Sequence, residues 1–205
     1  MKYTKTMSII GLDLAGVETR PTGFCNLAGM KAKTMLVYSN DEVLKKTGES
    51  KPLVVAIDAP LSLPPGRKSI EERTGVHLRE SDRALLLRGI KFFPITLGPM
   101  RRLTVRGIEL RRIFDYKDFR VIEVYPGGAQ DVLGISRKQQ GLDKLRIGLE
   151  GLGIKGLGNG MSDHELDAVT CAFVGKLFLD KKTVFYGPPN DAIIMPEGEK
   201  RRRAD

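Results

Sequence analysis

Acidic residues lie in several apolar runs of this sequence, where burying a free carboxylate would be costly. Asp13 ends the run "SIIGLD", and Asp58 ends "LVVAID" in the same way. Glu123 lies within a third apolar run, "RVIEVYP". A charged group in a protein interior must pair, bind a metal ion or take up a proton. These three residues are therefore candidates for chemistry as well as for structure.

Two further acids lie on a predicted helix near the C-terminus. Asp163 and Asp167 are four residues apart in "SDHELDAVTCAFV", so they share one helix face. Mg²⁺ and Mn²⁺ prefer oxygen ligands and could join carboxylates that come from separate elements. Two such ions would stabilise the attacking and leaving oxygens in phosphodiester cleavage. Each acid alone could simply cap a turn or, for Asp163, suit the helix dipole, so the metal hypothesis rests on the combination.

Apolar periodicity and turn residues predict the elements that position these acids. Three strands, over 8–13, 22–29 and 32–39, are expected to form an antiparallel meander. Two later strands, over 53–58 and 119–125, have the continuous apolar character of buried parallel strands. Helices are expected over 40–50, 81–90, 106–114, 142–153 and 162–180. This order predicts an α/β fold, in which a mixed sheet of three antiparallel strands and then parallel strands is flanked by helices.

Polar residues at the helix starts predict their caps. Asn40 or Asp41 would cap the first helix, and Ser81 the second. Ser162, with Glu165 three residues later, matches a capping box before the last helix. We expect a single domain over 1–196 with a helical insertion around 64–120, followed by a disordered basic tail at 197–205.

The charge of the chain favours a polyanionic partner. The 205 residues carry a formal net charge of +9 and are 41% hydrophobic. Eight basic and two acidic residues fall within 88–117, so the excess is concentrated inside the fold. The alternative is a helix whose basic face is simply solvated. The N-terminal "MKYTKTM" lacks the apolar region of a secretory signal, no run is long enough to span a membrane, and the two cysteines have no metal spacing. A cytoplasmic protein with reduced thiols is expected.

Five blocks, in order, resemble a known family. They are "GLDLAG", "VVAIDAPLSLP", "RESDRALLLRGIKFFP", "VIEVYPGGA" and "SDHELDAVTCAFV". They resemble the predicted nucleases known as domain of unknown function 429, which are placed in the ribonuclease H-like superfold. The resemblance implies metal-binding roles for Asp13, Asp58 and Asp167, with Asp163 as the alternative on the helix. "LDAVTCAF" also resembles the final-helix motif of bacterial Holliday-junction resolvases. Glu123 matches an acid of the "EVYP" block and would assist.

The block "LRESDRALLLR" would also contribute to the site. The resemblance marks Arg79 and Asp82 as typical of the family, and Arg83 is their neighbour. Arg79 could hold the scissile phosphate through a bidentate contact, oriented by Asp82. The alternative is a surface ion pair at the start of a helix. Within the basic segment, Arg101 and Arg102 are expected to contact the substrate backbone.

Two histidines could move a proton, and they differ in their surroundings. His164 lies between the two helix acids, which favours it over His77. Either could equally be a surface residue.

A nuclease dependent on Mg²⁺ or Mn²⁺ is the function that these residues predict. Its substrate would be DNA or RNA, and cutting two strands symmetrically would require a homodimer. One alternative is a nucleic-acid-binding module without catalysis. The other is a nucleotide-binding enzyme of the actin-like superfamily, which would need a second copy of the core.

Overall fold

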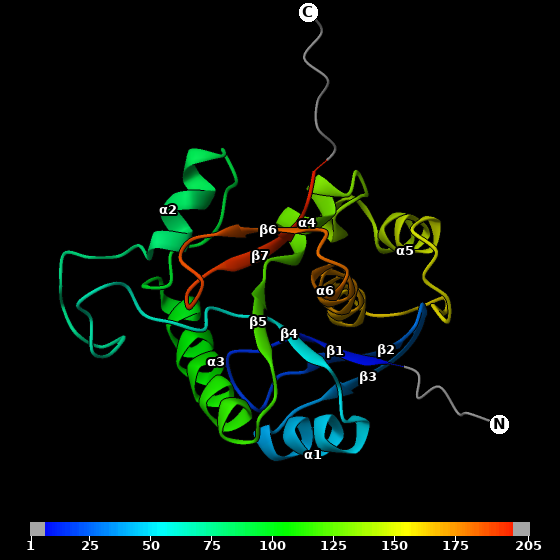
Figure 1. Ribbon diagram of the computed structural model, residues 1–205, viewed down its shortest axis with the longest axis horizontal. Helices are drawn as coiled ribbons and strands as arrows, with labels where there is room; N and C mark the ends of the chain where they lie inside the picture. Colours follow the sequence, from blue (N-terminus) through cyan, green and yellow to red (C-terminus); the bar gives the residue numbers. More distant parts are fainter. Residues whose placement is uncertain (1–6, 199–205) are drawn as a thin grey trace, which may run out of the picture.

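The computed structural model describes residues 7–198 and contains a mixed seven-stranded sheet with helices on both faces (Figure 1). Strands β1 (Ser8–Asp13), β2 (Thr22–Ala28) and β3 (Lys31–Val37) form the antiparallel meander that the sequence predicted. β4 (Val54–Asp58) pairs with β1 in parallel, and β5 (Val121–Val124) pairs with β4 in parallel. Three antiparallel strands are therefore followed by parallel ones, as expected.

Two short strands complete the sheet and were not predicted. β7 (Ile193–Pro196) runs parallel to β5, and β6 (Thr183–Tyr186) pairs with it antiparallel at the edge. The strand order is β3-β2-β1-β4-β5-β7-β6. Each of the two strands has only four residues, too few for a clear alternating pattern.

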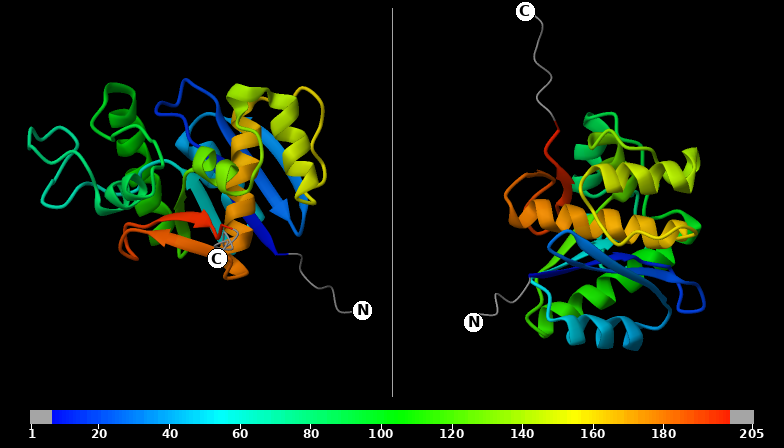
Figure 2. Two further views of the ribbon diagram at one scale, coloured as in Figure 1. Left: turned by 90° about the horizontal axis from the view of Figure 1, so that it is seen from above. Right: turned by 90° about the vertical axis from the view of Figure 1, so that its right-hand side faces the viewer.

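The helices form a layer on each face of the sheet (Figure 2). α6 (Asp163–Leu179) lies against β1, β2 and β4, with α4 (Pro126–Val132) and α5 (Leu142–Gly151) packed beside it. α1 (Asn40–Ser50) and α3 (Gly98–Tyr116) cover the opposite face. α2 (Glu80–Leu87) lies near β6, and a 3-10 turn, η1 (Lys138–Gln140), joins α4 to α5.

The first helix is capped one residue earlier than expected. Ser39 is the N-cap of α1, and its hydroxyl accepts a hydrogen bond from the Glu42 N–H at 3.1 Å. Asn40 and Asp41 therefore lie in the first turn, where the negative charge of Asp41 suits the helix dipole.

The second helix also begins differently. Arg79 is the N-cap of α2, and Asp82 accepts a hydrogen bond from the Arg79 N–H at 2.9 Å. Ser81 lies inside the first turn and is buried, so its prediction as the cap was wrong. Asp82 makes the capping contact instead, because it accepts hydrogen bonds from both the backbone and the side chain of Arg79, and Arg79 is itself held by Glu123. At α6 the predicted capping box of Ser162 and Glu165 is confirmed.

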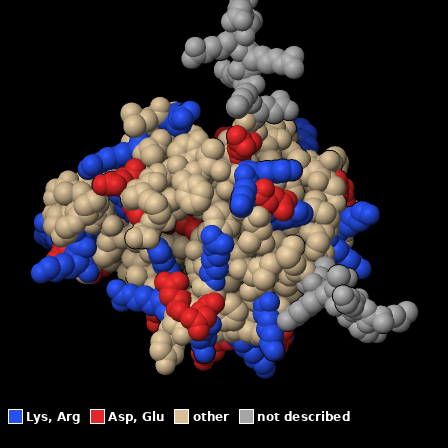
Figure 3. Space-filling model, in the orientation of Figure 1, with Lys and Arg blue, Asp and Glu red and all other residues tan. Residues whose placement is uncertain are grey.

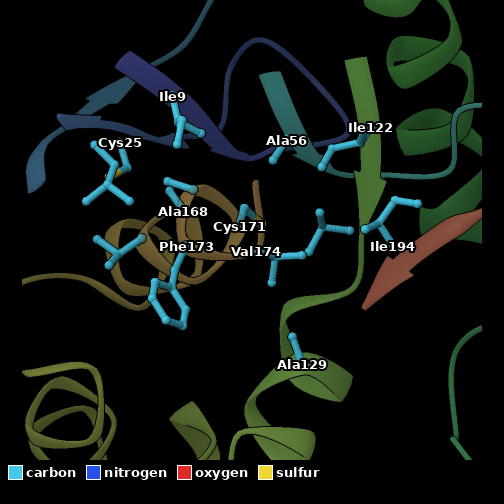
Figure 4. Close-up of a cluster of buried hydrophobic side chains, with 14 of the residues drawn as sticks. Ile9, Cys25, Ala56, Ile122, Ala129, Ala168, Cys171, Phe173, Val174 and Ile194 are labelled. Atoms are coloured by element: carbon cyan, nitrogen blue, oxygen red, sulfur yellow. The ribbon is translucent and has the colours of Figure 1, made fainter. Parts of the chain in front are cut away.

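Two glycines bring α6 unusually close to the sheet. A Cβ atom at Gly11 in β1 would lie 2.0 Å from the carbonyl oxygen of Ala168. A Cβ atom at Gly23 in β2 would lie 1.9 Å from the carbonyl oxygen of His164. Only glycine permits such an approach. Small residues of α6, including Ala168 and Cys171, pack directly on β1 and β4 (Figure 4).

No helix within 7–198 is long and apolar enough to cross a membrane. Most of the predicted basic tail, residues 199–205, lies outside the described part of the chain.

Candidate active site

The ends of two adjacent strands bring the first two predicted acids together. Asp13 and Asp58 are direct partners in the register of β1 and β4. Ile10 and Leu12 belong to the core beneath α1 and α3, whereas Ile9 belongs to the core beneath α6. Because side chains alternate along a strand, Asp13 and its partner Asp58 both face α6. Asp13 is 8% exposed, and Asp58 is half-buried.

The N-terminal part of α6 supplies the remaining groups. Asp167 is 4% exposed, and its charge acts on Asp58. His164, one turn earlier, places Nδ1 2.6 Å from Oδ2 of Asp13. Asp163 begins the helix and is half-buried. The predicted acids of β1, β4 and α6 therefore lie in one cluster at the carboxyl ends of the strands.

The electrostatics of the cluster call for positive charge. Burial, followed by the charges of Asp13 and Asp167, raises the pKa of Asp58 well above its ordinary value. Burial also raises the pKa of Asp167. The hydrogen bond with Asp13 raises the pKa of His164, which favours its charged form. A cation among these carboxylates lowers their mutual repulsion.

Lys138, which the sequence did not single out, contacts the cluster from η1. Its Nζ lies 2.8 Å from Oδ2 of Asp167 and 3.5 Å from Oδ2 of Asp163. Burial opposes the charge of Lys138, but its contact with Asp167 outweighs this and raises the lysine pKa. Nothing in the local sequence "ISRKQQG" marks this lysine, because its role comes from how α4 and α5 are packed.

Gln130 was also missed, although it directly follows the block "VIEVYPGGA". Its side-chain amide donates to Oδ1 of Asp167 at 2.8 Å and to Oγ1 of Thr170 at 3.1 Å. Gln130 is 1% exposed and comes from α4. It fixes one oxygen of Asp167 while Lys138 contacts the other.

Glu123 lies on the other face of the sheet from this cluster. Its neighbours Ile122 and Val124 pack in the core beneath α6, so by alternation Glu123 points away from that helix. Its two carboxylate oxygens accept hydrogen bonds from Arg79 at 2.7 and 2.8 Å, and one also accepts from the Leu61 N–H at 2.8 Å. Burial raises the pKa of Glu123, against the opposing effect of Arg79. Glu123 therefore faces away from α6 and is paired with Arg79, although it lines the same pocket as Asp58 and Asp167 and its charge acts on Asp58.

Arg79 is engaged by the protein itself. It is 2% exposed, and its guanidinium contacts Asp82 at 2.9 Å in addition to Glu123. Asp82 is 1% exposed, so this is a buried network rather than the surface ion pair considered as an alternative. The network has no donor left over for a phosphate, and it joins α2 to β5. Arg83, the next residue, is exposed.

The remaining predicted residues lie elsewhere. Arg101 and Arg102, in the first turns of α3, line a separate hollow of about 490 Å³ with Gly16, which follows β1 by three residues. Arg101 is paired with Glu71. His77 is exposed and contacts Thr96 at 3.2 Å, away from the acid cluster. On the face shown in Figure 3, basic and acidic side chains are interspersed.

The oxygen atoms of the cluster are of the type that binds a hard divalent cation, but their positions do not yet form a metal site. Asp13, Asp58 and Asp167 offer carboxylate oxygens, the ligands that Mg²⁺ and Mn²⁺ prefer. Burial, more than any other cause, raises the pKa of Asp58 and of Asp167, while Lys138 beside them acts in the opposite direction. Within 7–198, however, no three or more His, Cys, Asp or Glu side chains are positioned to hold a metal ion. Binding would require the three carboxylates to turn toward the ion and Lys138 to turn away from it.

The overall arrangement is similar to that of a solved structure. The structure of "T. thermophilus RuvC in complex with Holliday junction substrate" superposes with a TM-score of 0.53 and 13% identity, covering 92% of this chain and 99% of that one. The fold is ribonuclease H-like. A second structure, of Thermus thermophilus RuvC, gives a TM-score of 0.49 and 14% identity, covering 92% and 100% of the two chains. No family model and no curated protein matches the sequence, so membership of domain of unknown function 429 stays a prediction.

Proposed function

We propose that this protein is a divalent-metal-dependent nuclease that hydrolyses phosphodiester bonds of nucleic acids. The observation that carries the proposal is the meeting of Asp13, Asp58 and Asp167 at the carboxyl ends of β1 and β4, beneath α6. The ribonuclease H-like fold supports it, because RuvC, which shares that fold, has been solved with a Holliday junction substrate. The family resemblance of the five sequence blocks agrees with this assignment.

Each residue of the cluster has a role in this proposal. Asp13, Asp58 and Asp167 would hold Mg²⁺ or Mn²⁺, with Asp163 at the margin. When bound, such ions activate water and neutralise the phosphate. Gln130 orients Asp167, and Lys138 is placed to neutralise charge that develops on a phosphate oxygen.

His164 is the candidate for moving a proton. In the charged form, which the contact with Asp13 favours, Nδ1 donates a hydrogen bond to Asp13 and Nε2 also carries a proton that it could give to a leaving oxygen. We assign Arg79, Asp82 and Glu123 a positioning role, since their charges are used within the protein. Exposed Arg83, together with the hollow lined by Arg101 and Arg102, would contact the substrate backbone.

The decisive test compares Asp13→Asn with Asp180→Asn. Asp180 ends α6 at the opposite pole of that helix and pairs only with Lys176 at 2.7 Å among the described contacts. Cleavage of single-stranded, duplex and branched DNA and RNA is followed with Mg²⁺ or Mn²⁺, and again with EDTA. We expect activity in the wild type and in Asp180→Asn, and its loss in Asp13→Asn and in EDTA. Activity that persists in Asp13→Asn would refute the mechanism.

One observation favours a second candidate, a nucleic-acid-binding module without catalysis. Lys138 already contacts two acids of the cluster, as a permanent counter-ion would. That module would bind nucleic acid equally well with EDTA and show no Mn²⁺ binding by calorimetry. The nuclease proposal requires Mn²⁺ binding that Asp13→Asn abolishes.

A further inference from the structure

A pocket of about 320 Å³ opens directly beside the acid cluster. Its lining includes Asp58, Asp167 and Lys138 of the cluster, together with the buried pair of Arg79 and Glu123. Its volume falls within the range of sites that take small molecules. The pocket therefore includes charged groups of the proposed reaction centre in its walls.

Apolar and aromatic side chains form another part of the lining. They are Phe92, Phe93, Ile95, Met100, Leu103 and Tyr125. All but Tyr125 come from the segment between β4 and β5, in the predicted helical insertion. Phe93 is 73% exposed, and Phe92 is half-buried against the core. Aromatic side chains are few in this chain, at 6%, yet three of them line this one space.

Tyr125 presents an ordered ring with a cation beside it. Its hydroxyl donates a hydrogen bond to the Lys91 carbonyl oxygen at 2.9 Å, which fixes the ring. The guanidinium of Arg137 lies 5.9 Å from the ring centroid and is paired with Asp131. Arg137 also lines the pocket. A planar guanidinium at the rim can stack on a further aromatic system or contact a phosphate.

We propose that this pocket receives one unstacked nucleobase of the substrate while the adjoining phosphate lies at the acid cluster. This inference rests on the proposed function and names the form of its substrate. Aromatic walls stack any base without strong sequence preference, and the neighbouring carboxylates and Lys138 suit the phosphate that the base carries. A base inside an intact duplex cannot enter such a space without leaving its stack. The substrate is therefore single-stranded, or duplex at a position where a base is already unpaired.

The absence of tryptophan from the sequence gives a direct reporter. Phe93→Trp places a single tryptophan at the exposed wall of the pocket, where a stacked base would quench its fluorescence. The protein also carries Asp58→Asn, and EDTA is present. These two conditions prevent cleavage, and the substitution lessens repulsion of the substrate phosphate. The probes are a ten-nucleotide single strand, the same strand with one abasic position, and the blunt duplex.

Saturable quenching by the single strand is expected, with binding at least tenfold weaker for the duplex. In the same background without the tryptophan, Phe93→Ala and Phe92→Ala should each weaken single-strand binding by roughly 5- to 100-fold, measured by anisotropy of a labelled strand. Tyr116→Ala is the matched control, because Tyr116 is 89% exposed at the end of α3 and does not line the pocket. It should leave binding unchanged.

Equal binding by Phe93→Ala, Phe92→Ala and Tyr116→Ala would overturn the inference, as would equal binding of strand and duplex. Phe93 is mostly exposed, so its replacement tests the pocket even if Phe92→Ala is poorly folded. Cleavage by wild-type protein is scored separately. If the wild type cleaves nucleic acid but neither phenylalanine substitution weakens binding, the nuclease proposal stands and base binding in the pocket is refuted. If the phenylalanine substitutions weaken binding but no substrate is cleaved, base binding is supported and the nuclease proposal is refuted.

Discussion

Replacing Glu123 by glutamine is expected to lower the stability of the protein and to leave metal binding nearly unchanged. The sequence groups Glu123 with Asp13, Asp58 and Asp167, whereas the structure directs it to the opposite face of the sheet. There its carboxylate accepts two hydrogen bonds from Arg79. The substitution keeps the volume of the side chain and removes its charge.

The size of the effect follows from the burial of this pair. Removing one partner of a buried ion pair costs about 3–5 kcal/mol, because the other charge stays uncompensated. Glutamine still accepts from the Leu61 N–H, and Arg79 keeps Asp82, so we expect the lower end, about 3 kcal/mol. For a chain of this size that corresponds to a fall in Tm of roughly 6–12 °C.

Thermal unfolding followed by circular dichroism measures the stability of Glu123→Gln, and calorimetric titration with Mn²⁺ below the Tm measures its metal affinity. Asp13→Asn is the comparison, and it should show the reverse pattern, with Mn²⁺ affinity lost and little change in Tm. The reasoning is refuted if Glu123→Gln unfolds within about 2 °C of the wild type and loses Mn²⁺ affinity more than tenfold. Glu123 would then be a metal ligand.

Three further changes test the site and its support. Lys138→Met removes a cation that competes with metal for the helix acids, so Mn²⁺ affinity by calorimetry should rise about fivefold, whereas Lys176→Met at the far end of α6 should have no effect. Gly23→Ala forces a methyl group against the backbone of α6 and should lower the free energy of unfolding in urea by about 3 kcal/mol. Mn²⁺ binding should also weaken, because the helix is displaced. Unchanged stability would show that α6 can shift freely. Glu165→Gln tests the capping box. Burial opposes the charge of Glu165, but hydrogen bonds from Ser162 and Thr34 outweigh it and lower the pKa of Glu165 below 4.5. The wild type should therefore have the higher free energy of unfolding above pH 4.5, and this advantage should be lost as pH falls through the folded-state pKa. A difference in unfolding free energy that grows toward low pH would contradict this assignment.

Local sequence signals predicted the parts of this fold that depend on near neighbours. The meander, the parallel strands that end in Asp13 and Asp58, and the box of Ser162 and Glu165 all follow from periodicity and caps within a few residues. The α/β class follows from the order of these elements. The caps predicted at Ser81 and at Asn40 or Asp41 were wrong, because both helices begin earlier, with Ser39 as the N-cap of α1 and Arg79, bound by Asp82, as the N-cap of α2.

The sequence by itself determined which acids stand at the carboxyl ends of strands, because an aspartate that ends an apolar run is visible without any partner. Only the tertiary structure decided which of them meet. Sheet register set Asp13 beside Asp58, while alternation along β5 turned Glu123 toward Arg79, 44 residues away in sequence. Lys138 and the aromatic pocket are likewise set by the packing of distant segments, since contacts between side chains remote in sequence depend on which faces the chain buries.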